Sequence, residues 1–387
     1  MKTKVYSNEI GDCPSIIQNG GLVAVPTETV YGLACNGLNA DAVQNLYIAK
    51  GRPETKPLSL MVSDSSEIDK YCNNIPSYAL KFASGHWPGP FTLVFDAKDI
   101  IPSITLAGGN TVGLRCPDNN LTLELIRLSG VPLAAPSANI SNCTSSKNAD
   151  DVLQYFDGII DAVIDGGECS LKAESTIIDY SSDVIRILRK GFLKPHLIGI
   201  TGQSGAGKTT VLQYYKSISA GVIDCDELYH SMLETDFDLI SDLKTEFPDC
   251  FDINTLDRKK LGKIVFSDNE RLLTLNRITH NHISNAVIEK VIEMYNSGYT
   301  TIAIDAVELI SSGISDYCDL TIGIIADPEE RIKRIMIRDS IDYERAKARI
   351  SSQKPDSYYY DNCDIILENN GTEEEFNNKC LEVLRNA

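Results

Sequence analysis

Short apolar runs alternate along the chain with longer segments in which apolar and polar residues recur at helical spacing. Runs rich in β-branched residues, such as 197–201 and 301–305, end in small or polar residues. Residues 328–349 instead have a helical pattern. Strands that alternate with helices are typical of α/β proteins with parallel sheets. We therefore predict an α/β fold throughout.

A break in this pattern divides the chain into two parts of similar length. A strand predicted at 184–188 is followed by a segment that contains Gly191 and Pro195, and a new strand follows directly. Glycine and proline interrupt regular structure, and proline disfavours helix in the residue before it. We place the boundary near 193–196. The predicted domains are residues 1–194 and 195–387.

Composition and charge exclude several classes of protein. The 387 residues are 43% hydrophobic and 23% charged, which is typical of a folded globular protein and not of a disordered chain. The net charge is −18, and residues 1–195, with 16 basic and 21 acidic side chains, contribute only −5 of it. Because so acidic a surface repels phosphate backbones and anionic lipids, we expect no strong direct nucleic-acid binding and no membrane association.

The cysteines and the apolar runs indicate the cellular compartment of the protein. The eleven cysteines are scattered, and none forms a Cys-x-x-Cys pair. This argues against a secreted disulfide scaffold and a zinc ribbon, so reduced thiols are the simplest interpretation. We see no signal peptide, and no apolar run approaches the roughly 18 residues of a membrane span. We therefore expect a cytoplasmic protein.

A glycine-rich segment at 202–209 matches the phosphate-binding pattern G-x-x-x-x-G-K-[ST]. An apolar strand precedes it and a helical segment follows, so backbone N–H groups and a helix N-terminus would surround a phosphate. Lys208 would reach the β- and γ-phosphates of ATP, and Thr209 Oγ1 would hold Mg²⁺. The alternative is a glycine-rich turn without a ligand. The predicted ATP-binding residues of this half are Gly202, Gly205, Ala206, Gly207, Lys208, Thr209, Thr210 and, near the end of the chain, Asn369.

Carboxylates follow two further strands of this half. Asp224 and Asp226 come at the end of the strand predicted at 221–224, and Asp305 ends the strand at 301–305. The carboxyl ends of parallel strands face the ligand, so such a group could accept a proton from an attacking hydroxyl or hold Mg²⁺ through water. Asp224 or Asp226 could instead cap a helix, and Asp305 resembles a Walker-B position.

Residues 328–349 are rich in cations although this half is acidic. Such a cluster suggests a helical lid that grips an anion. The alternative is a solvated helix face paired with neighbouring carboxylates. Arg338 and Arg349 are our preferred candidates. The cations are Arg331, Lys333, Arg334, Arg338, Arg345, Lys347 and Arg349.

On these motifs the second half, about residues 197–385, resembles dephospho-CoA kinase, a small P-loop kinase. The resemblance also rests on Ile-Asp-x-Asp at 223–226, Leu-Asn-x-Ile-Thr-His at 275–280, and Gln353. It implies transfer of the ATP γ-phosphoryl group to the 3′-hydroxyl of dephospho-CoA. Asp226 would be the base, and Lys208, Arg338 and Arg349 would act on the phosphate. Another small-molecule kinase and a nucleotide-dependent regulatory module stay open as alternatives.

The first half lacks such a loop, but cations and small polar residues cluster near its predicted strand ends. Three cations fall within seven residues among prolines, which suits a triphosphate. The alternatives are a solvated basic turn, a surface ion pair and ordinary turn residues. The candidates are Lys50, Arg52 and Lys56, Arg115 on a strand, and Ser137 and Asn139 in a turn.

Taken in order, the motifs of residues 10–192 resemble the YrdC-like family, the threonylcarbamoyl-AMP synthases. The family fold implies an open, twisted α/β sheet around a deep positive cavity. The implied reaction converts ATP, L-threonine and bicarbonate into threonylcarbamoyl-AMP and pyrophosphate. The motifs lie at 26–33, 50–57, 88–92, 113–117, 135–141, 175–176 and 188–189.

This resemblance also implies residue roles and partners. The residues implied for threonine are Thr29, Arg115 and Ser175. Those implied for ATP are Lys50, Arg52, Lys56, Ser137, Asn139, Ser145 and Arg189. Partner proteins would use the product to modify a tRNA adenosine. We therefore predict a bifunctional enzyme that uses ATP in both halves and Mg²⁺ as cofactor.

Overall fold

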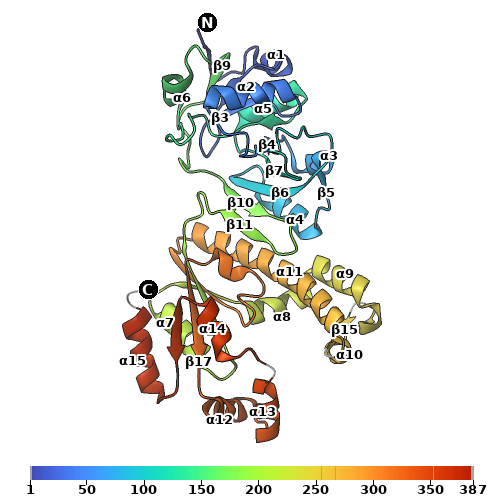
Figure 1. The fold of residues 1–387 in the computed structure, drawn as a ribbon, viewed down its shortest axis with the longest axis vertical. Helices are drawn as coiled ribbons and strands as arrows, with labels where there is room; N and C mark the ends of the chain where they lie inside the picture. Colours follow the sequence, from blue (N-terminus) through green and yellow to red (C-terminus); the bar gives the residue numbers. More distant parts are fainter. Residues whose placement is uncertain (1, 254, 266, 352, 385–387) are drawn as a thin grey trace. The chain divides into compact units, whose positions relative to one another are not determined.

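The computed structural model describes residues 2–384 apart from 254, 266 and 352. Contacts along the chain divide it into two compact units, residues 1–193 and 194–387. Each unit has its own sheet and its own apolar core (Figure 1). All eleven cysteines lie in the described part, and each is a free thiol. Across these residues no helix is long and apolar enough to cross a membrane.

The N-terminal unit is built on a mixed sheet of eleven strands. Their order is β1-β9-β2-β3-β8-β4-β7-β6-β10-β11, and β5 pairs with β6 outside this path. Neighbouring strands therefore come from distant parts of the sequence, which brings the motifs of this half together. The strands are β1 (Lys4–Ser7), β2 (Val23–Val25), β3 (Gly32–Asn36), β4 (Leu60–Met61), β5 (Cys72–Asn73), β6 (Phe91–Ala97), β7 (Thr111–Arg115), β8 (Leu133–Ala134), β9 (Ala162–Asp165), β10 (Thr176–Asp179) and β11 (Arg186–Arg189).

Helices cover this sheet and fix the segments between its strands. Helix α1 packs against α5 and on β2 and β3, burying Ile17, Val23 and Leu125 in one core. Helix α2 begins at the N-cap Asn39, whose side chain accepts from the N–H of Asp41, and ends at Gly51 in the left-handed conformation. The helices are α1 (Cys13–Gln18), α2 (Ala40–Lys50), α3 (Ile68–Tyr71), α4 (Ser77–His86), α5 (Asn120–Ser129) and α6 (Ala149–Phe156).

The C-terminal unit is built on a five-stranded sheet that is parallel throughout. The first strand, β12, lies in the middle, with β16 on one side and β17 on the other. The loop after β12 therefore lies where the strand order reverses, which is where open α/β sheets bind ligands. The strands in order of pairing are β13 (Gly221–Asp224), β16 (Thr301–Asp305), β12 (His196–Gly202), β17 (Leu320–Ile325) and β18 (Ile365–Glu368).

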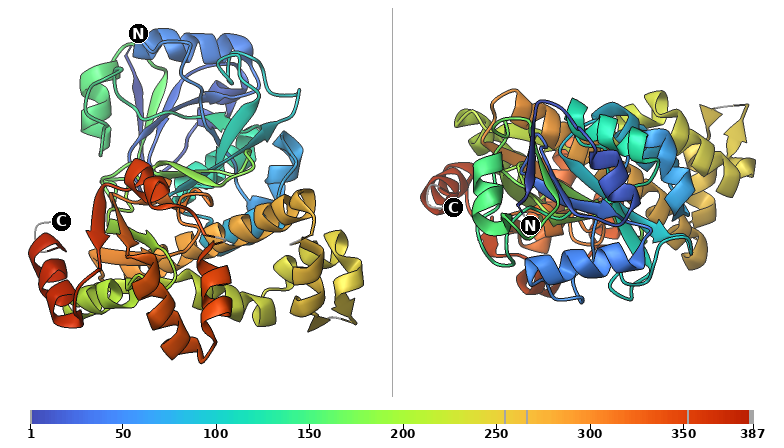
Figure 2. Two further views of the ribbon diagram at one scale, coloured as in Figure 1. Left: turned by 60° about the horizontal axis from the view of Figure 1, so that its bottom comes forward. Right: turned by 90° about the horizontal axis from the view of Figure 1, so that it is seen from above.

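Two apolar clusters hold this unit together. One joins Ile198 and Ile200 of β12 to Val211 of α7 and Phe376 of α15. The other lies among α8, α9, α10 and α11, beside the hairpin β14 (Phe251–Asp252) and β15 (Thr255–Leu256), where the long α11 runs out to the smaller helices (Figure 2). The helices are α7 (Lys208–Ser217), α8 (Cys225–Thr235), α9 (Phe237–Glu246), α10 (Arg258–Val265), α11 (Asn269–Asn296), α12 (Pro328–Asp339), α13 (Tyr343–Ser351), α14 (Asp356–Asn362) and α15 (Glu373–Leu384).

The predicted fold class is confirmed, and one helical segment contains a break that was not predicted. The first unit has an open mixed sheet, and the second has a parallel sheet with a helical segment over residues 328–351. The helical pattern at 328–349 corresponds to two helices, since α12 ends at Asp339 and α13 starts at Tyr343, and the pattern did not predict this break. Ser340 between them has φ 53°, a left-handed backbone that ends a helix.

Candidate active sites

A cavity of about 210 Å³ opens in the N-terminal unit. Guanidinium groups reach it from three separate segments: Arg52 follows α2, Arg115 ends β7, and Arg189 ends β11. The hydroxyl side chains of Ser137 and Ser175 also line it. Three cations and several hydroxyl groups in one cavity form a site suited to an anionic ligand.

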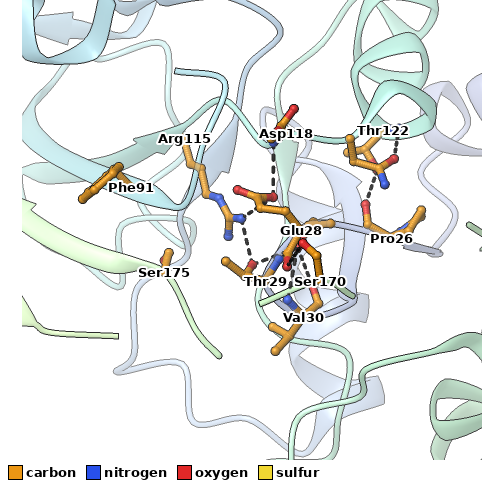
Figure 3. A network of polar contacts seen from close by, with 12 residues as sticks. Pro26, Glu28, Thr29, Val30, Phe91, Arg115, Asp118, Thr122, Ser170 and Ser175 are labelled. Carbon is orange, nitrogen blue, oxygen red and sulfur yellow. Dashed lines mark hydrogen bonds and ion pairs between the residues drawn. The ribbon is translucent and has the colours of Figure 1, made fainter. Parts of the chain in front are cut away.

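One wall of the cavity holds Arg115 in a buried polar network (Figure 3). Its Nη2 donates to Thr29 Oγ1 over 2.7 Å and lies 2.8 Å from Oε2 of Glu28. Thr29 Oγ1 is itself 2.8 Å from Thr27 Oγ1, which donates to the carbonyl of Val30 over 2.6 Å. Thr29 and the guanidinium of Arg115 are therefore fixed in relation to each other.

A second wall holds Arg189 and Ser175. Nε of Arg189 donates to the carbonyl of Ser175 over 3.0 Å, and Nη2 lies 2.9 Å from Ser175 Oγ. Ser175 Oγ is 2.9 Å from Thr92 Oγ1. Arg189 also forms an ion pair with Glu174, whose other oxygen accepts from Ser145 Oγ over 3.3 Å. Burial lowers the pKa of Arg189, but this guanidinium stays charged because its usual pKa is so high.

The C-terminal unit presents its glycine-rich loop between β12 and α7. Gly207 has φ 109°, and a Cβ there would lie 2.4 Å from Nδ2 of Asn369. That amide donates to the carbonyl of Ala206 over 2.7 Å, and Lys208 Nζ donates to the carbonyl of Gly202 over 3.2 Å. Only glycine fits at position 207, because any side chain would collide with the asparagine that holds the loop.

A second cavity of about 240 Å³ is lined in part by Val307, whose carbonyl accepts from Oγ1 of Thr201, the residue before this loop, over 3.1 Å. Asp226 lines it from the first turn of α8, and Asn276, Thr279 and His280 line it from α11. Asp224 is not a lining residue; its side chain caps α8 and accepts from the N–H groups of Asp226 and Glu227. Burial lowers the pKa of His280. The cavity therefore combines two exposed carboxylates, Asp226 and Glu308, with a largely apolar and amide-bearing wall.

The comparisons with known proteins agree with this geometry in both units. Residues 15–191 match the Sua5/YciO/YrdC family model, described as telomere recombination, and residues 196–375 match the CoaE family model, described as dephospho-CoA kinase. A putative threonylcarbamoyl-AMP synthase of Methanocaldococcus jannaschii is 38% identical over 177 residues, which are 46% of this chain and 83% of that protein. The chain belongs to the Sua5/YciO/YrdC family and carries a CoaE domain in its C-terminal half.

Two further relatives are longer. The threonylcarbamoyl-AMP synthase of Pyrococcus abyssi is 42% identical over 193 residues, which are 50% of this chain and 57% of that protein. That of Bacillus subtilis is 38% identical over 216 residues, which are 55% of this chain and 62% of that protein. The chain thus spans less than two thirds of either relative. Both predicted family resemblances are confirmed.

Of the ten residues predicted for the Sua5/YrdC unit, five line the cavity. These are Arg52, Ser137, Arg115, Ser175 and Arg189. Thr29 and Ser145 contact lining residues. The exposed Lys56 makes no side-chain hydrogen bond or ion pair with the described residues, whereas Arg52 donates to the carbonyls of Lys56 and Pro57 over 3.3 and 3.0 Å.

Lys50 and Asn139 are buried behind the cavity. Lys50 is 2% exposed, and its Nζ donates to the carbonyls of Ser137 and Asn139. Burial lowers the pKa of Lys50 to about 7. Asn139 accepts from Ser137 Oγ over 2.6 Å and donates to the carbonyls of Ile140 and Cys143 over 2.8 Å. In this geometry both side chains hold the loop that presents Ser137.

In the CoaE unit four of the five lid arginines form two pairs, and the fifth, Arg345, forms an ion pair with Asp342. Arg331 and Arg334 contact the glycine-rich loop, through the carbonyls of Ser204 at 3.1 Å and Gly205 at 3.3 Å. The preferred candidates Arg338 and Arg349 instead share the carboxylate of Asp339, and both are about half exposed. The lid pattern gave no signal that separates the two pairs, because the loop contacts depend on the tertiary fold.

Three polar side chains were missed as site residues. Glu28 lies within the motif at 26–33, Glu174 directly precedes Ser175, and Gln353 binds the glycine-rich loop through the N–H and Oγ of Ser204. Gln353 was noted only as part of a family motif. Glu174 gave no signal because a carboxylate is not expected in a cavity built for anions, and Glu28, which lies behind Arg115, does not line the cavity.

The described residues contain no group of three or more His, Cys, Asp or Glu side chains that could hold a metal ion. The CoaE unit still offers oxygen atoms of the kind that Mg²⁺ prefers. Thr209 is exposed in the first turn of α7, and Asp305 is largely buried at the end of β16. Asp305 Oδ1 has no hydrogen-bond partner, and burial raises the pKa of this carboxyl to about 6. This orphaned oxygen fits a cation or its water shell.

Proposed function

We propose that the protein is a bifunctional enzyme whose Sua5/YrdC unit makes threonylcarbamoyl-AMP. The substrates would be ATP, L-threonine and bicarbonate, and the second product would be pyrophosphate. The convergence of Arg52, Arg115 and Arg189 on one cavity supports this proposal most strongly. Partner proteins would then transfer the threonylcarbamoyl group to a tRNA adenosine.

The proposed chemistry needs charge and positioning more than a nucleophilic side chain. The carbamate of threonine would attack the α-phosphorus, and the bond to pyrophosphate would break. Arg52, Arg189 and Lys56 would neutralise the leaving pyrophosphate, which is the largest developing charge. Arg115 with Thr29 would hold the amino-acid carboxylate at the other wall, so that the carbamate is placed against the phosphate.

The synthase proposal is tested by pyrophosphate release from the full chain. We expect release only when ATP, L-threonine and bicarbonate are all present. Arg189→Ala should lower that rate by about 100-fold, because one donor to the developing charge is lost. Pyrophosphate release that needs neither threonine nor bicarbonate would refute the proposal.

We further propose that the CoaE unit transfers the γ-phosphoryl group of ATP to the 3′-hydroxyl of dephospho-CoA. Asp226 is exposed at the second cavity, and no other carboxylate of α8 lines that cavity in the described chain. It would take the hydroxyl proton as the new P–O bond forms and the bond to ADP breaks. Mg²⁺, when bound by Thr209 and near Asp305, would neutralise phosphate charge.

The kinase proposal is tested by incubating the full chain with Mg-ATP and dephospho-CoA and determining the mass of the product by mass spectrometry. We expect a product heavier by one phosphoryl group. Asp226→Asn should slow its formation by about 100-fold or more, whereas the neighbouring exposed Glu227→Gln should leave it unchanged. No product with ATP still bound would favour another acceptor or a regulatory module, and would refute this half of the proposal.

A further inference from the structure

The pair of Arg115 and Glu28 is the most deeply buried ion pair between side chains near the synthase cavity. Both side chains are 8% exposed, and their closest atoms are 2.8 Å apart. Arg115 lines the cavity and Glu28 does not. We propose that Glu28 is the positioning residue for Arg115, so that it fixes the guanidinium toward the carboxylate of the amino-acid substrate. This inference rests on the proposed synthase function.

The donors of Arg115 are divided between the protein and the cavity. Nη2 is engaged on both sides, by Glu28 Oε2 and by Thr29 Oγ1 at 2.7 Å. Nε is buried without a partner, and Nη1 has none among the described residues either. A buried guanidinium with unused donors requires a further acceptor. A ligand carboxylate in the cavity would provide it.

Glu28 is itself held in place from several directions (Figure 3). Its Oε2 accepts from the N–H of Asp118 over 3.2 Å, and its carbonyl accepts from the N–H of Leu171 and from Ser170 Oγ. The turn beside it is fixed because Thr27 Oγ1 accepts from the N–H groups of Thr29 and Val30. The backbone of Glu28 is therefore fixed, and its carboxylate is held through Oε2, which contacts both Arg115 and the N–H of Asp118, while Oε1 is buried without a hydrogen-bond partner.

The second carboxylate–guanidinium pair at the cavity is much more exposed than the pair of Arg115 and Glu28. Arg189 and Glu174 are 40% and 41% exposed, and both line the cavity. An incoming phosphate can replace Glu174 there, because water can solvate the released carboxylate. Glu28 cannot leave Arg115 in this way, since an unpaired charge would stay buried. The two carboxylates thus serve different purposes, and only Glu28 orients its partner.

The proposal is tested with Glu28→Gln, which keeps the shape of the side chain and removes its charge. We expect the KM for L-threonine in pyrophosphate release to rise at least about tenfold, with the KM for ATP changed less than about twofold. Glu168→Gln is the matched control, because Glu168 is 57% exposed and pairs with Lys172 on the surface; it should change neither constant. Equal losses for both substrates, together with a lower Tm, would mean a merely structural role and overturn the proposal.

A double-mutant cycle separates action through Arg115 from independent action. If Glu28 acts only by orienting Arg115, the double variant Glu28→Gln with Arg115→Lys should be no worse for threonine than Arg115→Lys alone. If the fold-increases in the KM for L-threonine of the two single variants instead multiply in the double variant, the proposal is overturned. Glu28→Asp, which keeps the charge, should raise the threonine KM less than Glu28→Gln and serves as the test if the glutamine variant folds poorly. Wild-type protein without threonine-dependent release would instead refute the synthase function itself.

Discussion

The two units present their candidate anion-binding groups in opposite ways. In the CoaE unit the phosphate loop is one continuous segment of eight residues that joins the central strand to α7. In the Sua5/YrdC unit the cationic groups come from positions as far apart as Arg52 and Arg189, and two of them already have carboxylate partners. The first site depends mainly on backbone N–H groups and the second on side chains.

This difference has a physical consequence for how each site tolerates change. A loop built from backbone donors is sensitive to any side chain that enters it, as at Gly207. A cavity built from paired side chains is sensitive to charge balance, because removing one partner leaves the other buried. The Sua5/YrdC unit should therefore respond to charge substitutions, and the CoaE unit to substitutions in the loop and its lysine.

The largest expected effect is that of Lys208→Ala on phosphoryl transfer. The loss of this ammonium group should slow transfer to dephospho-CoA by about 100-fold or more, because a donor to the phosphate charge is removed. Pyrophosphate release should stay at the wild-type rate. Both activities are to be measured on one preparation, and loss of both would contradict the assignment of separate sites.

An effect of similar size is expected on stability, from Asp305→Asn. Burial raises the pKa of Asp305 from its usual 3.8 to about 6. The native unit therefore binds more protons than the unfolded chain between about pH 4 and 6. Its free energy of unfolding falls as the pH rises through this window, by about 3 kcal/mol. The asparagine variant should lack this fall. Its free energy of unfolding, compared with that of the wild type, should therefore be higher at pH 8 than at pH 4.

The measurement for this variant can separate the two units. Trp87 is the only tryptophan of the chain and lies in the Sua5/YrdC unit. Urea unfolding followed by far-UV circular dichroism reports on both units, whereas tryptophan fluorescence follows the first. The pH-dependent difference should appear in the dichroism alone. The same difference in fluorescence would contradict the assignment to Asp305.

Much of the fold follows from local sequence patterns. The apolar runs at 197–201 and 301–305 lie in β12 and β16. The break between α12 and α13 was missed, because Ser340 is an ordinary residue whose left-handed backbone depends on the packing of the two helices. The sheet order of the first unit could not be derived either, since pairing between distant strands is a tertiary property.

The sites differ in how far the sequence reveals them. The phosphate loop is contiguous, so its pattern predicts it directly. Arg115 was a candidate because it lies on a predicted strand, Ser175 became one only through the family resemblance, and nothing local places the two in one cavity. The partnership of Glu28 with Arg115 was not predicted, because a glutamate beside two threonines is also typical of an exposed turn. Its burial is decided by β7 and the segment that carries Asp118.

Lys56→Ala should have a moderate effect, and it tests what a solvent-exposed positive charge contributes to ATP binding in the Sua5/YrdC unit. Lys56 is exposed and pairs with no described carboxylate, so its removal should leave the Tm unchanged. We expect the KM for ATP in pyrophosphate release to rise by about tenfold at low salt, and less as salt screens the charge. Kinase activity serves as the internal control. An unchanged KM for ATP at low salt would remove Lys56 from the proposed ATP site.

The smallest effect concerns Asp339, which holds Arg338 and Arg349 on the lid of the CoaE unit. Asp339→Asn removes an ion pair between partly exposed groups, so it should leave the Tm almost unchanged. If these arginines act on the transferred phosphate, freeing them should lower kcat for phosphoryl transfer by a few-fold, because their orientation is lost. The comparison with Glu28→Gln is direct, since each substitution neutralises one carboxylate that holds arginine. If Asp339→Asn impairs its unit as much as Glu28→Gln is expected to impair the synthase, then the exposure of an ion pair does not determine how much its loss matters.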